Sequence, residues 1–115
     1  MVRIRTAMIT MPPIFRDLVT ELMVGHGTLD VVGEFDTRTG LKEQLQKLAP
    51  DLILLKLLRD EGNEIGRELA RMRPGMKVIA FSSDAHDAFV YRMPLQHTVL
   101  LDVSPRTLID AIIKS

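Results

Sequence analysis

The chain has 115 residues, a length that suits one domain with a hydrophobic core and is too short for two. Hydrophobic residues make up 46% of it and charged residues 26%, and fifteen Lys and Arg residues balance fifteen Asp and Glu residues without forming blocks. This composition excludes a disordered or fibrous protein and offers no basic patch for direct nucleic-acid binding, and the absence of cysteine excludes disulfides and thiolate metal sites.

Apolar runs of strand length alternate along the chain with segments of helical periodicity. Such alternation is typical of a parallel sheet with crossover helices. The strands are predicted at Ile4 to Ile9, Asp30 to Phe35, Asp51 to Leu55, Lys77 to Phe81 and Thr98 to Leu101. The pattern predicts an α/β fold in which residues 1–115 form a single domain with a doubly wound, five-stranded parallel sheet.

Helices are expected between these strands. Apolar residues recur at helical spacing in four segments: Ile14, Leu18 and Leu22; Leu41, Leu45 and Leu48; Ile65, Leu69 and Met72; and Leu108 with Ile112. Pro13 suits the start of the first helix and Gly25 its end, while Ser104 and Pro105 suit the start of the last. A further helix from Asp84 to Met93 is expected on weaker periodicity, with Pro94 ending it.

In a doubly wound sheet, ligands bind outside the carboxyl ends of the strands. The residues there are Thr10 and Met11, Phe35 and Asp36, Lys56, Ser82 and Ser83, and Leu101 and Asp102. The stretch ITMPPIF after the first strand lacks the glycines of a dinucleotide-binding turn, and no P-loop or zinc-helix motif is present. Ser82 or Ser83 could form a hydrolytic triad with His97 and Asp102, but no nucleophile elbow surrounds them. We therefore expect no catalytic residue and no cofactor.

Several stretches together resemble the receiver domain of two-component response regulators, especially receivers followed by a LuxR-type helix-turn-helix domain. They are MITMPPIFRDLVTEL, LDVVGEFDT, PDLILLKLL, VIAFSS and VLLDVSPRTLIDAI, in the family's order between Val2 and Ile113. The resemblance implies a flavodoxin-like (CheY-like) fold with strand order 2-1-3-4-5, and a role in phosphorelay signal transduction and transcription regulation. Receivers accept a phosphoryl group on an aspartate that ends the third strand, with magnesium held by an acid pair after the first strand.

Carried onto this chain, the resemblance places the acid pair at Thr10 and Met11, the phosphoacceptor at Lys56, the switch hydroxyl at Ser82 and the lysine of the fifth strand at Leu101. Only Ser82 fits the family's pattern. Magnesium requires hard oxygen ligands, and an ammonium group cannot become an acyl phosphate. The resemblance therefore implies a pseudo-receiver, a degenerate receiver that binds no metal and has lost phosphotransfer.

The segment from Ser82 to Leu101 is shorter than in the family and lacks the glycine-containing turn before the fifth strand. This departure leaves the helix from Asp84 to Met93 open. Because this face often carries the family's partner surface, the departure also suggests a different mode of signalling.

Lys56 at the end of an apolar strand has two interpretations. In the first, it forms an ion pair with Asp84, Asp102 or Asp36 and locks the strand ends, because burial would lower its pKa unless a carboxylate compensated. In the second, its stem covers apolar surface while the amine reaches solvent.

The first and last helices each carry two neighbouring apolar stripes. The extra stripes are Phe15, Val19 and Met23 in the first helix, and Ile109 and Ile113 in the last. Either they bury against each other, or they form a patch for a homodimer or another protein partner.

The leading hypothesis is a receiver-like signalling domain that acts through protein contacts, independent of aspartyl phosphorylation. One alternative is a receiver that responds to phosphate through Asp60 or another nearby acid, and another is a small-ligand-binding or hydrolytic α/β domain. The N-terminus lacks the apolar core of a signal peptide and no run could span a bilayer, so we expect a cytoplasmic protein without membrane contact. Whether an output domain follows Ser115 stays open.

Overall fold

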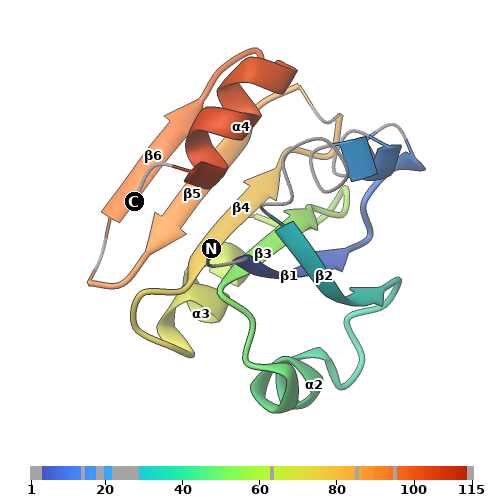
Figure 1. Ribbon diagram of the computed structural model, residues 1–115, viewed down its shortest axis with the longest axis vertical. Helices are drawn as coiled ribbons and strands as arrows, with labels where there is room; N and C mark the ends of the chain where they lie inside the picture. The colour runs from blue at the N-terminus through green and yellow to red at the C-terminus, as the bar shows by residue number, and fades with distance from the viewer. Residues whose placement is uncertain are drawn as a thin grey trace.

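The computed structural model describes residues 4–13, 15–17, 20–21, 29–62, 64–84, 86–94 and 96–113. In this part of the chain, a six-stranded sheet lies between helices on its two faces (Figure 1). The strands are β1 (Ile4–Ile9), β2 (Leu29–Phe35), β3 (Leu52–Lys56), β4 (Lys77–Phe81), β5 (Ala88–Arg92) and β6 (Gln96–Leu100). The helices are α2 (Leu41–Leu48), α3 (Glu64–Arg71) and α4 (Pro105–Ile113), and the strand order is β2-β1-β3-β4-β5-β6.

The first four strands are parallel to one another, as predicted. β1 lies between β2 and β3, and β4 pairs with the far side of β3, all in parallel. The register places Ile9 opposite Leu55, and Lys56 opposite Phe81. The carboxyl ends of β1, β3 and β4 therefore meet at one edge of the sheet, where a site was expected.

The remainder of the sheet corrects the prediction, because a wholly parallel sheet of five strands and a helix from Asp84 to Met93 are both wrong. β5 takes the place of that helix and runs antiparallel to β4, and β6 runs antiparallel to β5. The connection of residues 82–87 between β4 and β5 is too short for a parallel crossover, which needs about a dozen residues or more. The aromatic and β-branched side chains of β5 (AFVYR) also favour a strand.

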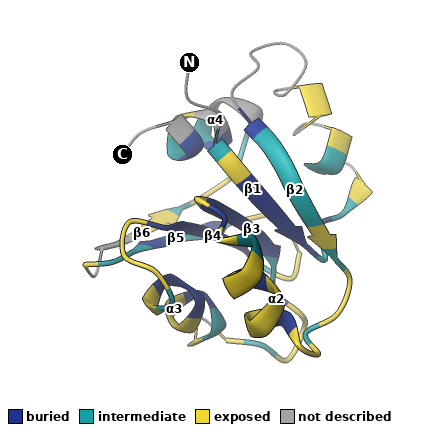
Figure 2. Cartoon of the chain, turned by 60° about the horizontal axis from the view of Figure 1, so that its bottom comes forward, coloured by how far each residue is buried: buried dark blue, intermediate teal, exposed yellow. Residues whose placement is uncertain are grey.

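Each face of the sheet carries its own apolar cluster. Alternate residues of a strand point to opposite faces, so Ile53 and Leu55 pack in the cluster under α2 and α3, whereas Leu52 and Leu54 pack in the cluster under α4. Figure 2 shows α2 and α3 on one side of the sheet and α4 on the other. The apolar run of β3 is thus explained by burial on both sides.

Besides its pairing with β4, the β5–β6 hairpin packs against α3. The Tyr91 side chain of β5 is completely buried. A Cβ atom placed on Gly66 of α3 would lie 2.6 Å from Cε2 of the Tyr91 ring, so only glycine permits this close approach.

A buried lysine fixes the end of α4 to the sheet. Lys77, the first residue of β4, is only 7% exposed. Its Nζ donates to the carbonyl oxygen of Ala111 at 2.6 Å and lies 3.4 Å from that of Ile112, both in the last turn of α4. Burial, and to a lesser extent the charge of Arg92, lower the pKa of Lys77. The amine thus satisfies carbonyl groups that a helix end leaves without intrahelical partners.

The predicted first helix is only partly described. Residues 13, 15–17 and 20–21 are helical, and Phe15 stacks on Phe81 with ring centroids 4.7 Å apart. Outside the described residues lie Ile14, Leu18, Val19, Leu22, Met23 and Gly25. In α4, Leu108 and Ile112 are buried as predicted, but the side chains of Ile109 and Ile113 are likewise not described. A homodimer through these two helices therefore stays a prediction.

Among the described helices, none is both long enough and apolar enough to cross a membrane.

Candidate functional site

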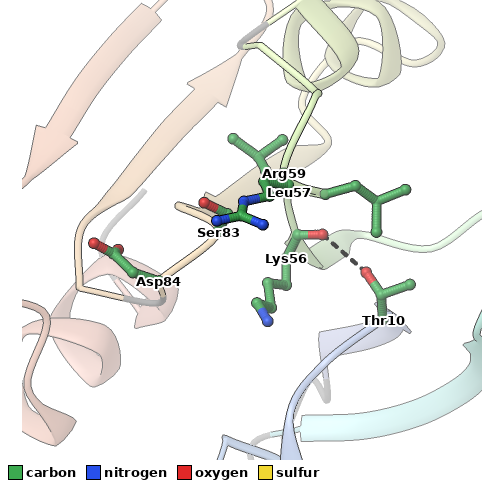
Figure 3. A pocket seen from close by; sticks show the side chains of 7 residues that line it. Thr10, Lys56, Leu57, Arg59, Ser83 and Asp84 are labelled. Atoms are coloured by element: carbon green, nitrogen blue, oxygen red, sulfur yellow. Dashed lines mark hydrogen bonds between the residues drawn. The ribbon is translucent and has the colours of Figure 1, made fainter.

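A pocket of about 570 Å³ lies at the edge where the carboxyl ends of β1, β3 and β4 meet. It is lined by Thr10, Lys56, Leu57, Leu58, Arg59, Ser83 and Asp84 (Figure 3). Thr10 follows β1, the residues from Lys56 to Arg59 end β3 and begin the next loop, and the last two belong to the β4–β5 loop. The predicted positions Thr10 and Lys56 therefore lie together.

Thr10 ties the end of β1 to both neighbouring strands. Its backbone N–H donates to the carbonyl oxygen of Phe35 at 2.7 Å, and its hydroxyl donates to the carbonyl oxygen of Lys56 at 2.8 Å. Its φ of 51° is uncommon for a β-branched residue. These bonds hold a conformation that the residue would otherwise avoid.

Arg38, in the loop after β2, makes the most extensive polar contacts of the site. Its guanidinium binds Glu61 in a bidentate ion pair, with Nε 2.8 Å from Oε2 and Nη2 2.7 Å from Oε1. Nη2 also donates to the carbonyl oxygen of Lys56 at 2.9 Å, and Nη1 lies 3.3 Å from the Thr10 hydroxyl. One cation thus connects the ends of β1 and β3 with the loops that follow β2 and β3.

Glu61 completes this tie. Besides Arg38, its Oε1 accepts the backbone N–H of Leu58 at 2.7 Å. The hydrogen bonds from Arg38 hold the pKa of the Glu61 carboxyl below its ordinary value, with partial burial opposing them and the Leu58 N–H adding to them. The Arg38 and Glu61 side chains are only 20% and 21% exposed, so solvent screens the pair less than it screens a surface ion pair.

Lys56 reaches the pocket with its side chain half-buried. Among the described residues, its Nζ has no hydrogen bond or ion pair. The three carboxylates expected as its partners have others. Asp36 lies 3.6 Å from Arg16, Asp84 accepts a hydrogen bond from Ser82 at 2.6 Å, and Asp102 lies 2.7 Å from His86. The interpretation of Lys56 as an ion-pair lock finds no support in these contacts, and the cation that ties the strand ends is Arg38.

The side chains at the positions of the acid pair do not fit magnesium. The Thr10 hydroxyl is engaged with the Lys56 carbonyl group, and Met11 is 5% exposed in the apolar cluster under α4. A hydroxyl, a thioether and an ammonium group are a poor ligand set for a hard dication. In the described ranges, no group of three or more His, Cys, Asp or Glu side chains could hold a metal ion.

Ser82 lies at the end of β4 as expected, and its hydroxyl organises the next loop. It donates to Asp84 and accepts the backbone N–H of Asp87 at 3.1 Å. The Ser82 hydroxyl, and next the backbone N–H of His86, lower the pKa of the Asp84 carboxyl. Ser82 therefore acts here as a turn residue.

Leu101, assigned to the fifth-strand lysine, does not line the pocket. It is 69% exposed and follows β6, which β5 separates from β4. The extra strand in the hairpin therefore moves this position away from the end of β3.

The alternative sites of the sequence are not assembled among the described side chains. In the hydrolytic triad, Ser82 pairs with Asp84 and Asp102 with His86, while the side chain of His97 lies outside the described set. Asp60, the alternative phosphoacceptor, is exposed in the turn after β3 and does not line the pocket.

Sequence reasoning missed Arg38, Glu61 and Arg59. A usable signal was present, because each residue follows closely on the carboxyl end of a predicted strand, in DTRTG after β2 and LLRDEG after β3. What the sequence did not reveal is that Arg38 and Glu61 face each other across two loops.

No family model matches the chain, and no solved structure matches it. Over 76 residues the chain is 38% identical to the response regulator protein VraR of Staphylococcus saprophyticus subsp. saprophyticus. The match covers 64% of this chain but only 36% of that protein, so the chain spans well under two thirds of this relative. The α/β architecture, with its parallel 2-1-3 strand order, is compatible with a flavodoxin-like fold. Over the matched residues, the chain is thus similar to part of a response regulator.

Proposed function

We propose that the chain is a pseudo-receiver: a receiver-like domain of two-component signalling that acts through protein contacts, without aspartyl phosphorylation and without enzymatic activity. The observation that carries this proposal is Lys56 at the end of β3. Receivers have their phosphoacceptor aspartate at that position, and an ammonium group cannot form an acyl phosphate. The poor ligand set around Thr10 and Met11 supports the same conclusion, because phosphoryl transfer of this kind depends on a divalent ion.

The tie between Arg38 and Glu61 also supports the proposal. In the family, magnesium is held by an acid pair after the first strand and assists phosphorylation of the aspartate that ends the third. In this chain, the Arg38 guanidinium contacts both the Thr10 hydroxyl and the Lys56 carbonyl oxygen. A fixed side-chain cation can hold these strand ends in one arrangement without metal or phosphate, which suits a domain whose shape carries the signal.

The partner under this proposal is another protein, with a second copy of the chain as one form of it. The resemblance to LuxR-tailed receivers extends the proposal to transcription regulation in the cytoplasm. DNA binding then belongs to a different domain, because the charges of this chain are balanced and form no basic blocks.

The test is exposure to phosphoryl donors. The protein is incubated with magnesium and acetyl phosphate, and the mass of the intact chain is then measured by mass spectrometry. In a second experiment, a labelled sample is titrated with magnesium and beryllofluoride, and its amide chemical shifts are recorded. A phosphorylation-competent receiver treated in parallel provides the positive control. We expect no gain of a phosphate in mass and no localised shifts at Thr10, Lys56 or Ser82.

A phosphate on an aspartate of the wild-type protein after donor treatment would contradict the proposal. The variant Asp60→Asn identifies the acid in that case, because loss of the added mass in this variant would establish the alternative receiver that uses Asp60. The variant Lys56→Asp adds a carboxylate at the end of β3 but no acid pair. We expect it to stay unphosphorylated, because the magnesium ligands are still missing.

A further inference from the structure

We propose that the pocket at the ends of β3 and β4 binds a small phosphomonoester reversibly, with Lys56 and Arg59 as its cationic contacts. The inference rests on the proposed function, because it makes this non-covalent ligand the regulator of a domain that forms no acyl phosphate. It starts from the two basic side chains that line one pocket.

Lys56 and Arg59 are available to a ligand. Among the described residues, neither side chain has a hydrogen bond or an ion pair, in contrast to Arg38, Lys42 and Arg73, which all contact carboxylates. Figure 3 shows the Lys56 amine and the Arg59 guanidinium on the same side of the loop after β3, with Ser83 beside Arg59. Two cations and a hydroxyl suit an oxyanion that carries two charges.

The acid in the pocket does not neutralise these cations. Asp84 lines the pocket, but its Oδ1 accepts hydrogen bonds from the Ser82 hydroxyl at 2.6 Å and the His86 backbone N–H at 3.0 Å. In Figure 3 the Asp84 carboxylate is directed away from Lys56. The nearby Glu61 forms an ion pair with Arg38. Asp84 and Glu61 therefore have partners, whereas among the described residues Lys56 and Arg59 have none.

The pocket also has room and apolar surface for more than a phosphate group. Its volume of about 570 Å³ falls in the range of small-molecule sites, roughly 300–1,000 Å³. Leu57 and Leu58 line it, and Leu58 is 47% exposed although it is a large apolar residue. A phosphomonoester with a small apolar group matches this combination better than free phosphate, because the exposed Leu58 can cover the apolar part.

In the test, labelled protein is titrated with phenyl phosphate in magnesium-free buffer, and binding is measured from the amide chemical shifts. Inorganic phosphate and phenol are titrated separately, to distinguish the charged group from the ring. We expect saturable shifts at Thr10, from Lys56 to Arg59 and at Ser83, with phenyl phosphate bound more tightly than either comparison compound. Added salt is expected to weaken the binding, because it screens exposed charges.

Matched neutral variants identify the contacts. Lys56→Met removes the amine but keeps most of the length of the side chain, and we expect it to weaken binding about tenfold. Arg59→Met is expected to weaken binding roughly threefold, because this side chain is exposed. Lys47→Met removes a charge from the far end of α2 and is expected to leave affinity unchanged. The dispersion of the amide spectrum shows whether each variant is folded, and Lys56→Gln serves as the second variant if Lys56→Met is not.

Absence of saturable shifts in the wild-type protein, or equal weakening by Lys47→Met and Lys56→Met, would overturn the phosphomonoester site. Neither result touches the proposed pseudo-receiver, whose test is covalent phosphate after donor treatment. Conversely, a covalent phosphate would overturn the pseudo-receiver whatever phenyl phosphate does. Binding that reverses on dialysis, with unchanged mass, is the result expected if both proposals hold.

Discussion

The parallel strands and the β5–β6 hairpin use the same sheet in different ways. In the parallel part, the ends of β1 and β3 lie side by side, and Thr10, Arg38 and Glu61 tie them to the adjacent loops. In the hairpin, β5 runs toward the opposite edge, so its last residues are remote from the pocket. The parallel part therefore determines the chemistry of the pocket, whereas the hairpin determines how far the last strand lies from it.

The largest effect on the free energy of unfolding is expected where the β5–β6 hairpin packs against α3. Replacing Tyr91 with alanine removes a completely buried ring that packs on Gly66, and we expect it to lower the free energy of unfolding by about 3–5 kcal/mol. The matched change Val99→Ala, in β6, affects a side chain that is 45% exposed and should cost less than about 1 kcal/mol. Denaturation by urea measures both. Equal losses would show that Tyr91 does not anchor the hairpin.

The next largest effect on the free energy of unfolding is expected from the contacts of Arg38 with Glu61 and the Lys56 carbonyl group. Arg38→Ala leaves Glu61 partly buried without its cation and removes donors to the Lys56 carbonyl group, so we expect a loss of about 2 kcal/mol. Lys42→Ala is the control, because it breaks an exposed ion pair with Glu68 and should cost no more than about 0.5 kcal/mol. The unfolding midpoints in urea compare the two variants. A difference near zero would mean that the tie contributes no stability.

The charge of Glu61 gives a smaller, pH-dependent effect. Its pKa is lowered in the folded state, so its contribution is fully present above the unfolded pKa of about 4.3 and is lost as the pH falls through the folded pKa. We expect the stability difference between the wild-type protein and Glu61→Gln to be constant near neutrality and to shrink below that value. Urea unfolding at a series of pH values measures it. A stability difference that increases as the pH falls would show that the pKa of Glu61 is raised, not lowered, in the folded state.

The smallest effect is expected at Leu101. This residue is 69% exposed and lies outside the pocket, so Leu101→Lys should change the stability by no more than about 0.5 kcal/mol. It should also leave the binding of phenyl phosphate unchanged. Tighter binding in this variant would show that the last strand reaches the pocket after all.

Much of the parallel part could be predicted from the sequence. Apolar runs of strand length and helical stripes, such as Leu41 with Leu45, directly reflect burial, and the strand ends at Thr10 and Lys56 follow from the topology. The hairpin was not predicted, because the weak helical periodicity of residues 84–93 favours a helix. The short connection after β4 and the residues Phe89, Val90 and Tyr91 instead favour a strand. Local periodicity is weak evidence where loop length decides the topology.

The site was predictable in its position but not in its contacts. The sequence places Lys56 at the end of β3, and the structure places it in the pocket. Its expected ion pair depended on the directions of side chains in three loops, which no spacing rule supplies. The pair of Arg38 and Glu61 was missed for the same reason, since the two residues are distant in the sequence and meet only after β1, β2 and β3 are aligned.

The anchoring of α4 by Lys77 limits how this helix can move. Its buried amine donates to a carbonyl group in the last turn of the helix. Sliding α4 along its axis, or lifting it from the sheet, would break the hydrogen bonds of this buried charged group. Repositioning of α4 is therefore expected as a switch between discrete states rather than a gradual drift. A partner that binds and displaces α4 would therefore also displace Lys77, the first residue of β4.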